Sequence, residues 1–132
     1  MPAISRDELK TILAFGVHIA KLDQKFDIWE KKILGRFAEA MRLSPDERKA
    51  LATQRFSLGK GLHALASDGA RVLLVKLMCA VSFVDGSASD QELEFIERVV
   101  TRLKSQVFIL PREDWGRYEK EVFKALEDLK LA

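Results

Sequence analysis

The segment "FVDGSASDQE", residues 83–92, places a polar and acidic turn directly after a long apolar run. A less regular copy, "LDQKFDIWE", occupies residues 22–30. In each segment an aspartate is followed seven positions later by a glutamate, at Asp23 and Glu30 and again at Asp85 and Glu92. The two segments, which we call the first and second acidic turns, predict that the chain contains the same structural unit twice.

An internal repeat with an offset of 62 residues accounts for both acidic turns. The apolar positions that flank the turns coincide under the same shift, which a chance match of two acids would not produce. Two copies of a helix, an acidic turn and a second helix, at about residues 12–43 and 74–105, therefore predict packing about a pseudo-twofold axis. The matching apolar pairs are Leu13 with Val75, Phe15 with Leu77, Ile19 with Val81, Leu22 with Val84, Ile33 with Phe95, Leu34 with Ile96, Phe37 with Val99, and Met41 with Leu103.

Helix signals cover nearly all of the chain. Ser5 and Glu8 form a capping box, and Ser44 and Glu47 form another with a proline at the first helical position. Apolar residues recur at helical spacing after each signal, and no stretch alternates convincingly with period two over strand length. We expect an all-α fold, a single compact bundle of six to seven helices in one domain, residues 1–132.

Other helix boundaries follow from the same signals. We expect a helix at 58–66 that Gly59 and Gly61 weaken, and a long apolar helix at about 70–84. Asp27 with Glu30 and Ser89 with Glu92 open the helices that follow the acidic turns. The C-terminal helix is expected at about 111–130, starting at Pro111, after the short β-prone segment 105–111.

Composition indicates a globular protein of balanced charge. The 132 residues carry 22 Lys plus Arg and 20 Asp plus Glu, so the chain lacks the excess of basic residues typical of nucleic-acid-binding proteins, and we expect no nucleic acid as partner.

The single cysteine, Cys79, excludes an internal disulfide, fits a reducing compartment and is interpreted as a buried structural thiol. The apolar run 72–84 contains Lys76 and is shorter than the roughly 20 residues of a membrane span, so we expect a cytoplasmic protein with no transmembrane segment.

The acidic turns allow three interpretations. Asp27 with Glu30 and Ser89 with Glu92 are capping boxes that need no other role. Asp23 and Asp85 lie at the C-terminal ends of helices, where the helix dipole disfavours an anion, so the turns also fit a divalent cation held by oxygen ligands. Ion pairs with lysines such as Lys21 or Lys25 are the third interpretation. The candidate metal ligands are Asp23, Asp27, Glu30, Asp85, Ser89, Asp90 and Glu92.

"HIAKLDQKFDIWEKKIL" and "CAVSFVDGSASDQELEFI" resemble the two halves of a TerB-like domain, the tellurite-resistance family, which is also similar to the N-terminal part of some membrane-tethered J-domain co-chaperones. The resemblance covers about residues 12–103. It implies an all-helical pseudo-symmetric fold, an acidic metal-binding surface and a scaffolding role in stress-response assemblies. The second turn keeps the Asp-Gly pair of the family at Asp85 and Gly86, with Ala88 where a larger apolar residue is usual. The first turn has Gln24 in place of the glycine.

Enzyme signatures do not occur in the sequence. There is no nucleophile motif, Walker loop or H-E-x-x-H pair. A helical metal-dependent hydrolase would usually show more acidic residues, together with basic or aromatic residues that bind the substrate. His18 is one turn before Asp23, and is interpreted as a partly buried side chain in preference to a ligand. Trp29 and Trp115 are candidates for partner contacts or for packing between helices.

From these observations we expect a non-enzymatic TerB-like interaction or scaffold module of a bacterial stress system of the tellurite-resistance type. It binds a protein partner, with a homo-oligomer as one form of partner, and a divalent cation through its acidic turns. The alternative is a metal-free regulatory or co-chaperone-associated adaptor in which the turns are purely structural. A metal-dependent hydrolase is the least favoured function.

Overall fold

The described part of the computed structural model comprises residues 4–23, 32–53, 55–65, 67–83, 90–103 and 117–128. All regular structure in these ranges is helical, without strands, as the sequence predicts. None of the helices in these ranges is long and apolar enough to cross a membrane. The seven helices are α1 (Arg6–Asp23), α2 (Lys32–Ala40), α3 (Pro45–Thr53), α4 (Leu58–Ala64), α5 (Asp68–Phe83), α6 (Asp90–Leu103) and α7 (Arg117–Asp128).

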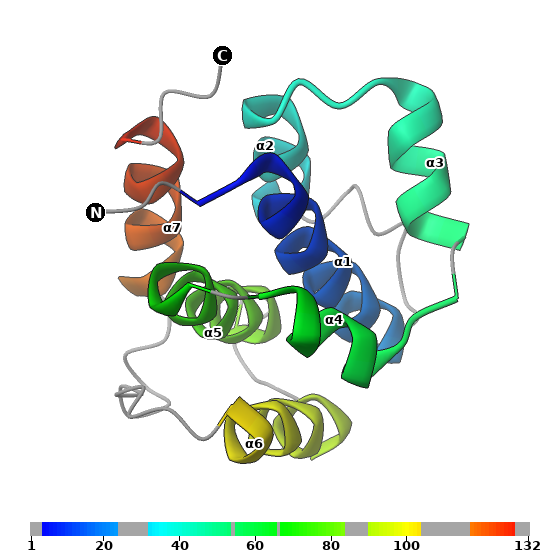
Figure 1. Cartoon of the computed structure of the whole chain (residues 1–132), viewed down its shortest axis with the longest axis vertical. Helices are drawn as coiled ribbons and strands as arrows, with labels where there is room; N and C mark the ends of the chain where they lie inside the picture. Colours follow the sequence, from blue (N-terminus) through cyan, green and yellow to red (C-terminus); the bar gives the residue numbers. More distant parts are fainter. Residues whose placement is uncertain are drawn as a thin grey trace.

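Helices α1 and α5 form the centre of the bundle and pack extensively against each other. Helix α6 lies against both of them, and α7 lies against α5 and α2 (Figure 1). Helices α3 and α4 each contact α1, α4 in front of it and α3 at one edge of the molecule (Figure 1). The two central helices therefore share α6 as a neighbour, while α3 and α4 cover α1 and α7 covers α5.

The buried residues follow the repeat. In every matching apolar pair in which both side chains are described, both are buried, and they belong to one hydrophobic core. Helix α5 also begins 62 residues after α1, at Asp68 against Arg6. These agreements are what a repeated helix pair requires, while superposition of the two halves about a pseudo-twofold axis stays a prediction.

Serine side chains cap the N-termini as the sequence indicates. The Glu8 amide donates to Ser5 Oγ at 3.1 Å and the Glu47 amide donates to Ser44 Oγ at 3.1 Å, and in both boxes the glutamate accepts from the serine amide. The Ala70 amide donates to Ser67 Oγ at 3.2 Å, so α5 begins two residues earlier than the expected position 70. Each cap satisfies amides that the first helical turn leaves without a partner.

Glu8 caps two helices at once. One carboxylate oxygen accepts from the Ser5 amide at 3.1 Å, and the other accepts from the amide and hydroxyl of Ser67, at 3.3 and 3.2 Å. Burial acts to raise the pKa of Glu8, but these hydrogen bonds outweigh it and the pKa lies below its usual value. A single carboxylate thus joins the N-termini of α1 and α5.

The C-terminus of α2 closes in a Schellman motif. The Leu43 amide donates to the Ala38 carbonyl at 3.1 Å, and the Arg42 amide donates to the Glu39 carbonyl at 2.9 Å. Arg42 takes the left-handed conformation that this motif needs, with φ of 56°. Arg6 of α1 donates to the Met41 carbonyl at 2.6 Å, which fixes the end of α2 against the beginning of α1.

Several expected features fall outside the described residues. They are the starts of the helices at Asp27 and Ser89, the β-prone segment 105–111, the helix start at Pro111, and the side chains of Trp29 and Trp115. The described parts of the corresponding helices begin at Lys32, Asp90 and Arg117.

Candidate functional site

The acidic turns lie largely outside the described residues. Asp23 is the last residue of α1, as expected for an aspartate at a helix C-terminus, but its side chain is not among those described. The other turn residues outside the described ranges are Asp27, Glu30, Asp85 and Ser89. That these side chains converge on one cation therefore stays a prediction.

Asp90 and Glu92 are the two predicted ligands whose side chains are described. Asp90 is exposed at the first position of α6, whereas Glu92, in the first turn of the same helix, is only 2% exposed. Ser82, near the end of α5, is also 2% exposed. Ser82 and Glu92 are the two buried polar residues of the described core, and in the sequence they flank residues 84–89.

A metal site is not formed by the described side chains alone. Within the described ranges, no group of three or more His, Cys, Asp or Glu side chains is placed to hold a metal ion. Any site at the second turn would therefore combine Asp90 or Glu92 with residues 84–89.

His18 is held by aromatic packing. Its ring stacks on Phe56 with centroids 4.2 Å apart and lies 4.8 Å from the Phe95 ring. Burial, together with the nearby Lys21 charge, lowers the pKa of His18 and favours the neutral imidazole. This is the partly buried role that the sequence favours. Lys21 itself donates to the Ala52 carbonyl and ties α1 to the end of α3.

Cys79 is buried in α5, as expected from its apolar surroundings. Burial raises the pKa of its thiol to about 12. Because the thiolate is the reactive form, this thiol is inert in the folded protein.

A groove of about 400 Å³ lies between α1, α3 and α4. Its lining comes from two parts of the chain, residues 10–15 and 47–64, and its charged residues are three cations and one carboxylate. The lining residues are Lys10, Thr11, Ala14 and Phe15 from α1, Glu47, Ala50 and Leu51 from α3, Arg55, Phe56 and Ser57 from the connection, and Lys60, Gly61 and Ala64 from α4.

Contacts between α1 and α4 fix the inner wall of this groove. A Cβ atom on Gly61 would lie 2.5 Å from Phe15 Cε1, so only glycine allows α4 to approach the Phe15 ring this closely. The Phe15 ring in turn meets Phe56 edge-on, with centroids 4.9 Å apart. Phe56 is thus clamped between Phe15 and His18 and presents a fixed apolar surface.

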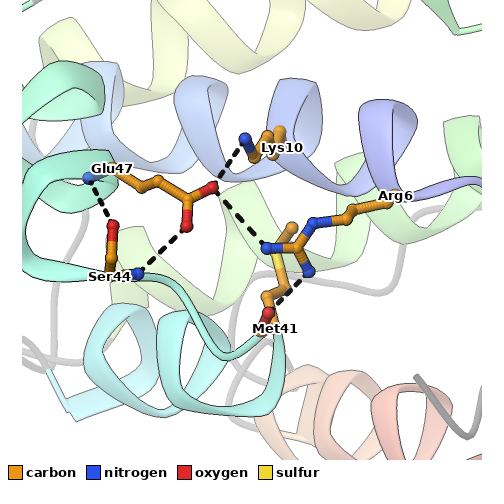
Figure 2. Close-up of polar contacts among 5 residues, drawn as sticks. All are labelled: Arg6, Lys10, Met41, Ser44 and Glu47. Carbon is orange, nitrogen blue, oxygen red and sulfur yellow. Dashed lines mark hydrogen bonds and ion pairs between the residues drawn. The ribbon is translucent and has the colours of Figure 1, made fainter. Parts of the chain in front are cut away.

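Glu47 closes one end of the groove with a charge cluster. Its carboxylate lies 2.7 Å from Lys10 Nζ and 3.6 Å from an Arg6 guanidinium nitrogen, while it also accepts from the Ser44 amide (Figure 2). The hydrogen bond from Lys10 is the main cause that lowers the pKa of Glu47 to about 2. Lys10 is therefore already neutralised by Glu47.

Arg55 and Lys60 differ from Lys10, because neither side chain has an acidic partner among the described residues. Both are exposed at the rim of the groove. Sequence reasoning did not find this site. The available signal was the pair Arg55-Phe56 followed by Lys60, a cationic and aromatic cluster beside two glycines.

The comparisons with known proteins give no assignment: no family model, no curated protein and no solved structure matches this chain.

Proposed function

We propose that the chain is a non-enzymatic interaction module, similar to TerB-like domains, that acts as a scaffold in a bacterial stress system and binds a divalent cation at its acidic turns. The position of Glu92 carries this proposal. Carboxylate oxygens are ligands that a hard divalent cation prefers, and Glu92 is the last residue of the second acidic turn, in the first turn of α6.

A metal-free regulatory or co-chaperone-associated adaptor is the second candidate. It is favoured by the capping boxes at Ser5 and Ser44, which form as their sequences predict. Glu92 is the third residue after Ser89, so the same capping geometry would give its carboxylate a structural role without any ion.

Thermal unfolding with Ca²⁺, Mg²⁺, Mn²⁺ or Zn²⁺ against a chelator separates the two candidates. A ligand at about 100 times its Kd that binds only the folded state stabilises it by roughly 2.7 kcal/mol, a Tm rise of several degrees. Glutamine can serve in a capping box, so Glu92→Gln should keep the stability of the chelated protein and lose the rise.

Glu47→Gln is the matched control, since Glu47 is a capping-box glutamate far along the chain from both turns. Its cation response should equal that of the unchanged protein. If no divalent ion raises the Tm, or if Glu92→Gln responds fully, the cation proposal fails and the metal-free adaptor is favoured.

A further inference from the structure

The groove between α1, α3 and α4 has cationic residues in its lining and so differs in charge from the acidic turns. Its floor is apolar, with Ala14 and Phe56 partly exposed and the buried Leu51 and Phe15 behind them. Stacking on His18 and edge contact with Phe15 hold the Phe56 ring in one position. A fixed apolar floor favours binding because little ordering is required when a ligand arrives.

The charges at the rim select an anionic occupant. Arg55 and Lys60 are exposed and have no ion-pair partner in the described part of the chain, whereas Glu47, the carboxylate of the lining, is held by Lys10 at 2.7 Å. The groove therefore presents two available cations beside an apolar floor. Opposite charges across such an interface would accelerate association and fix the register of the ligand.

The shape of the groove favours a segment of polypeptide. Ala50 on α3 and Ala64 on α4 are exposed on its walls, and the small side chains at Ala14, Ala50, Gly61 and Ala64 leave room for a chain to lie close to the helices. An occupant would keep one side in solvent, as a docked peptide does, in contrast to a small ligand in an enclosed pocket.

We propose that this groove binds an acidic segment of a partner protein, with a bulky apolar side chain on the Phe56 floor and carboxylates paired with Arg55 and Lys60. The inference rests on the proposed function as an interaction module, for which it names the chemistry of the partner. It uses a surface separate from the acidic turns, so binding should persist in the presence of a chelator.

A library of random 12-residue peptides displayed on phage and selected on the immobilised full chain, with chelator present, tests the proposal. The selected peptides should be enriched in Asp and Glu next to a large apolar residue. Selection of neutral or basic peptides, or no enrichment, would overturn the proposed chemistry of the groove.

Variants locate the binding with a synthetic, fluorescently labelled copy of the selected peptide. Fluorescence anisotropy should show Kd raised at least tenfold by Arg55→Glu with Lys60→Glu, and also by Ala50→Phe, which fills the groove without changing its charge. Lys120→Glu with Lys124→Glu on the exposed face of α7 is the control with the same change of charge, and its Kd should rise less than threefold. Circular dichroism checks that each variant is folded.

Equal weakening by the two double variants would indicate general charge attraction and overturn the groove as the site. Sedimentation velocity tests whether the groove instead binds another copy of this chain. If the unchanged protein is an oligomer and the Arg55→Glu, Lys60→Glu variant is a monomer, the groove is an interface between copies and the proposal is wrong. A normal cation response together with failed peptide selection would leave the proposed function in place and remove only this inference.

Discussion

The α1–α2 pair and the α5–α6 pair both contribute buried residues at the positions that the predicted repeat aligns, but they meet partly different neighbours. Helices α3 and α4 cover α1, whereas α7 covers α5 and also reaches α2. The N-termini differ as well, because α1 has its own capping glutamate, Glu8, and the aligned residue in α5 is the buried Ala70. Ser67 at the start of α5 contacts Glu8 instead.

This difference separates positions of the shared core from positions that meet other helices. The aligned positions that face the core are apolar in both pairs, since every one of them loses burial energy if it becomes polar. The groove lies outside this shared core, where α3 and α4 meet α1.

The largest expected effect comes from equivalent core residues. Phe15→Ala should lower the free energy of unfolding by about 3–5 kcal/mol and Leu77→Ala by about 2–5 kcal/mol, because both side chains are fully buried. Urea unfolding followed by circular dichroism measures both. Val72→Ala, at the exposed surface of α5, is the control and should change stability by roughly 0.5 kcal/mol or less. A Leu77→Ala effect as small as the control would break the equivalence of the two pairs.

Two glycines of α4 test how this helix packs on α1. Gly61→Ala should destabilise the protein by about 1–3 kcal/mol, because its Cβ would lie 2.5 Å from the Phe15 ring. Gly59→Ala meets nothing within 4 Å and should stabilise it by roughly 0.5–1 kcal/mol. Chemical denaturation compares the pair, and effects of the same sign would contradict the close packing of α4 on α1.

Removal of the carboxylate that joins the pairs should have an intermediate effect. Glu8→Ala takes an acceptor from two helix N-termini and should cost on the order of 1–2 kcal/mol. A double-mutant cycle with Ser67→Ala should give a non-additive result, since the two side chains are hydrogen-bonded. Strict additivity would show that Glu8 acts only on α1.

The smallest expected effect is a change in acid sensitivity. The folded-state pKa of Glu47 is about 2 against an ordinary value of 4.5, and the pKa of Glu8 is also lowered. The unfolded state then binds more protons, so the stabilisation by these groups is complete above pH 4.5 and is lost as the pH falls through about 2. Denaturation at several pH values should show a shallower decline for Glu47→Gln. An unchanged profile would indicate that the contacts with Lys10 and Arg6 do not persist in solution.

Local patterns in the sequence were sufficient for much of the fold. The capping boxes at Ser5 and Ser44 and the apolar spacing depend on residues a few positions apart, so the all-helical architecture and the buried Cys79 were predictable. The second role of Glu8 was not, because its contact with Ser67 crosses 59 residues of chain. Gly61 was interpreted as weakening a helix, whereas the structure shows that it admits the Phe15 ring.

The candidate sites show the same division. The acidic turns were visible because their residues are contiguous, although their ligand geometry stays a prediction. The groove was harder to predict: Arg55, Phe56 and Lys60 are close in sequence, but Lys10 and Phe15 join them only through packing of α1 against α3 and α4. Spacing along the chain carries no information on that long-range contact.

Isothermal titration calorimetry of a divalent ion into the unchanged protein and the Asp85→Ala and Asp23→Ala variants tests whether the acidic turns bind a cation. Gly86 allows positive φ after Asp85, while Gln24 makes the equivalent turn cost about 1 kcal/mol or more, and Asp90 adds a carboxylate where the first turn has Ile28. We expect binding heat in the unchanged protein, none in Asp85→Ala, and most of it in Asp23→Ala. No heat with any divalent ion, or loss of heat in Asp23→Ala alone, would contradict this expectation.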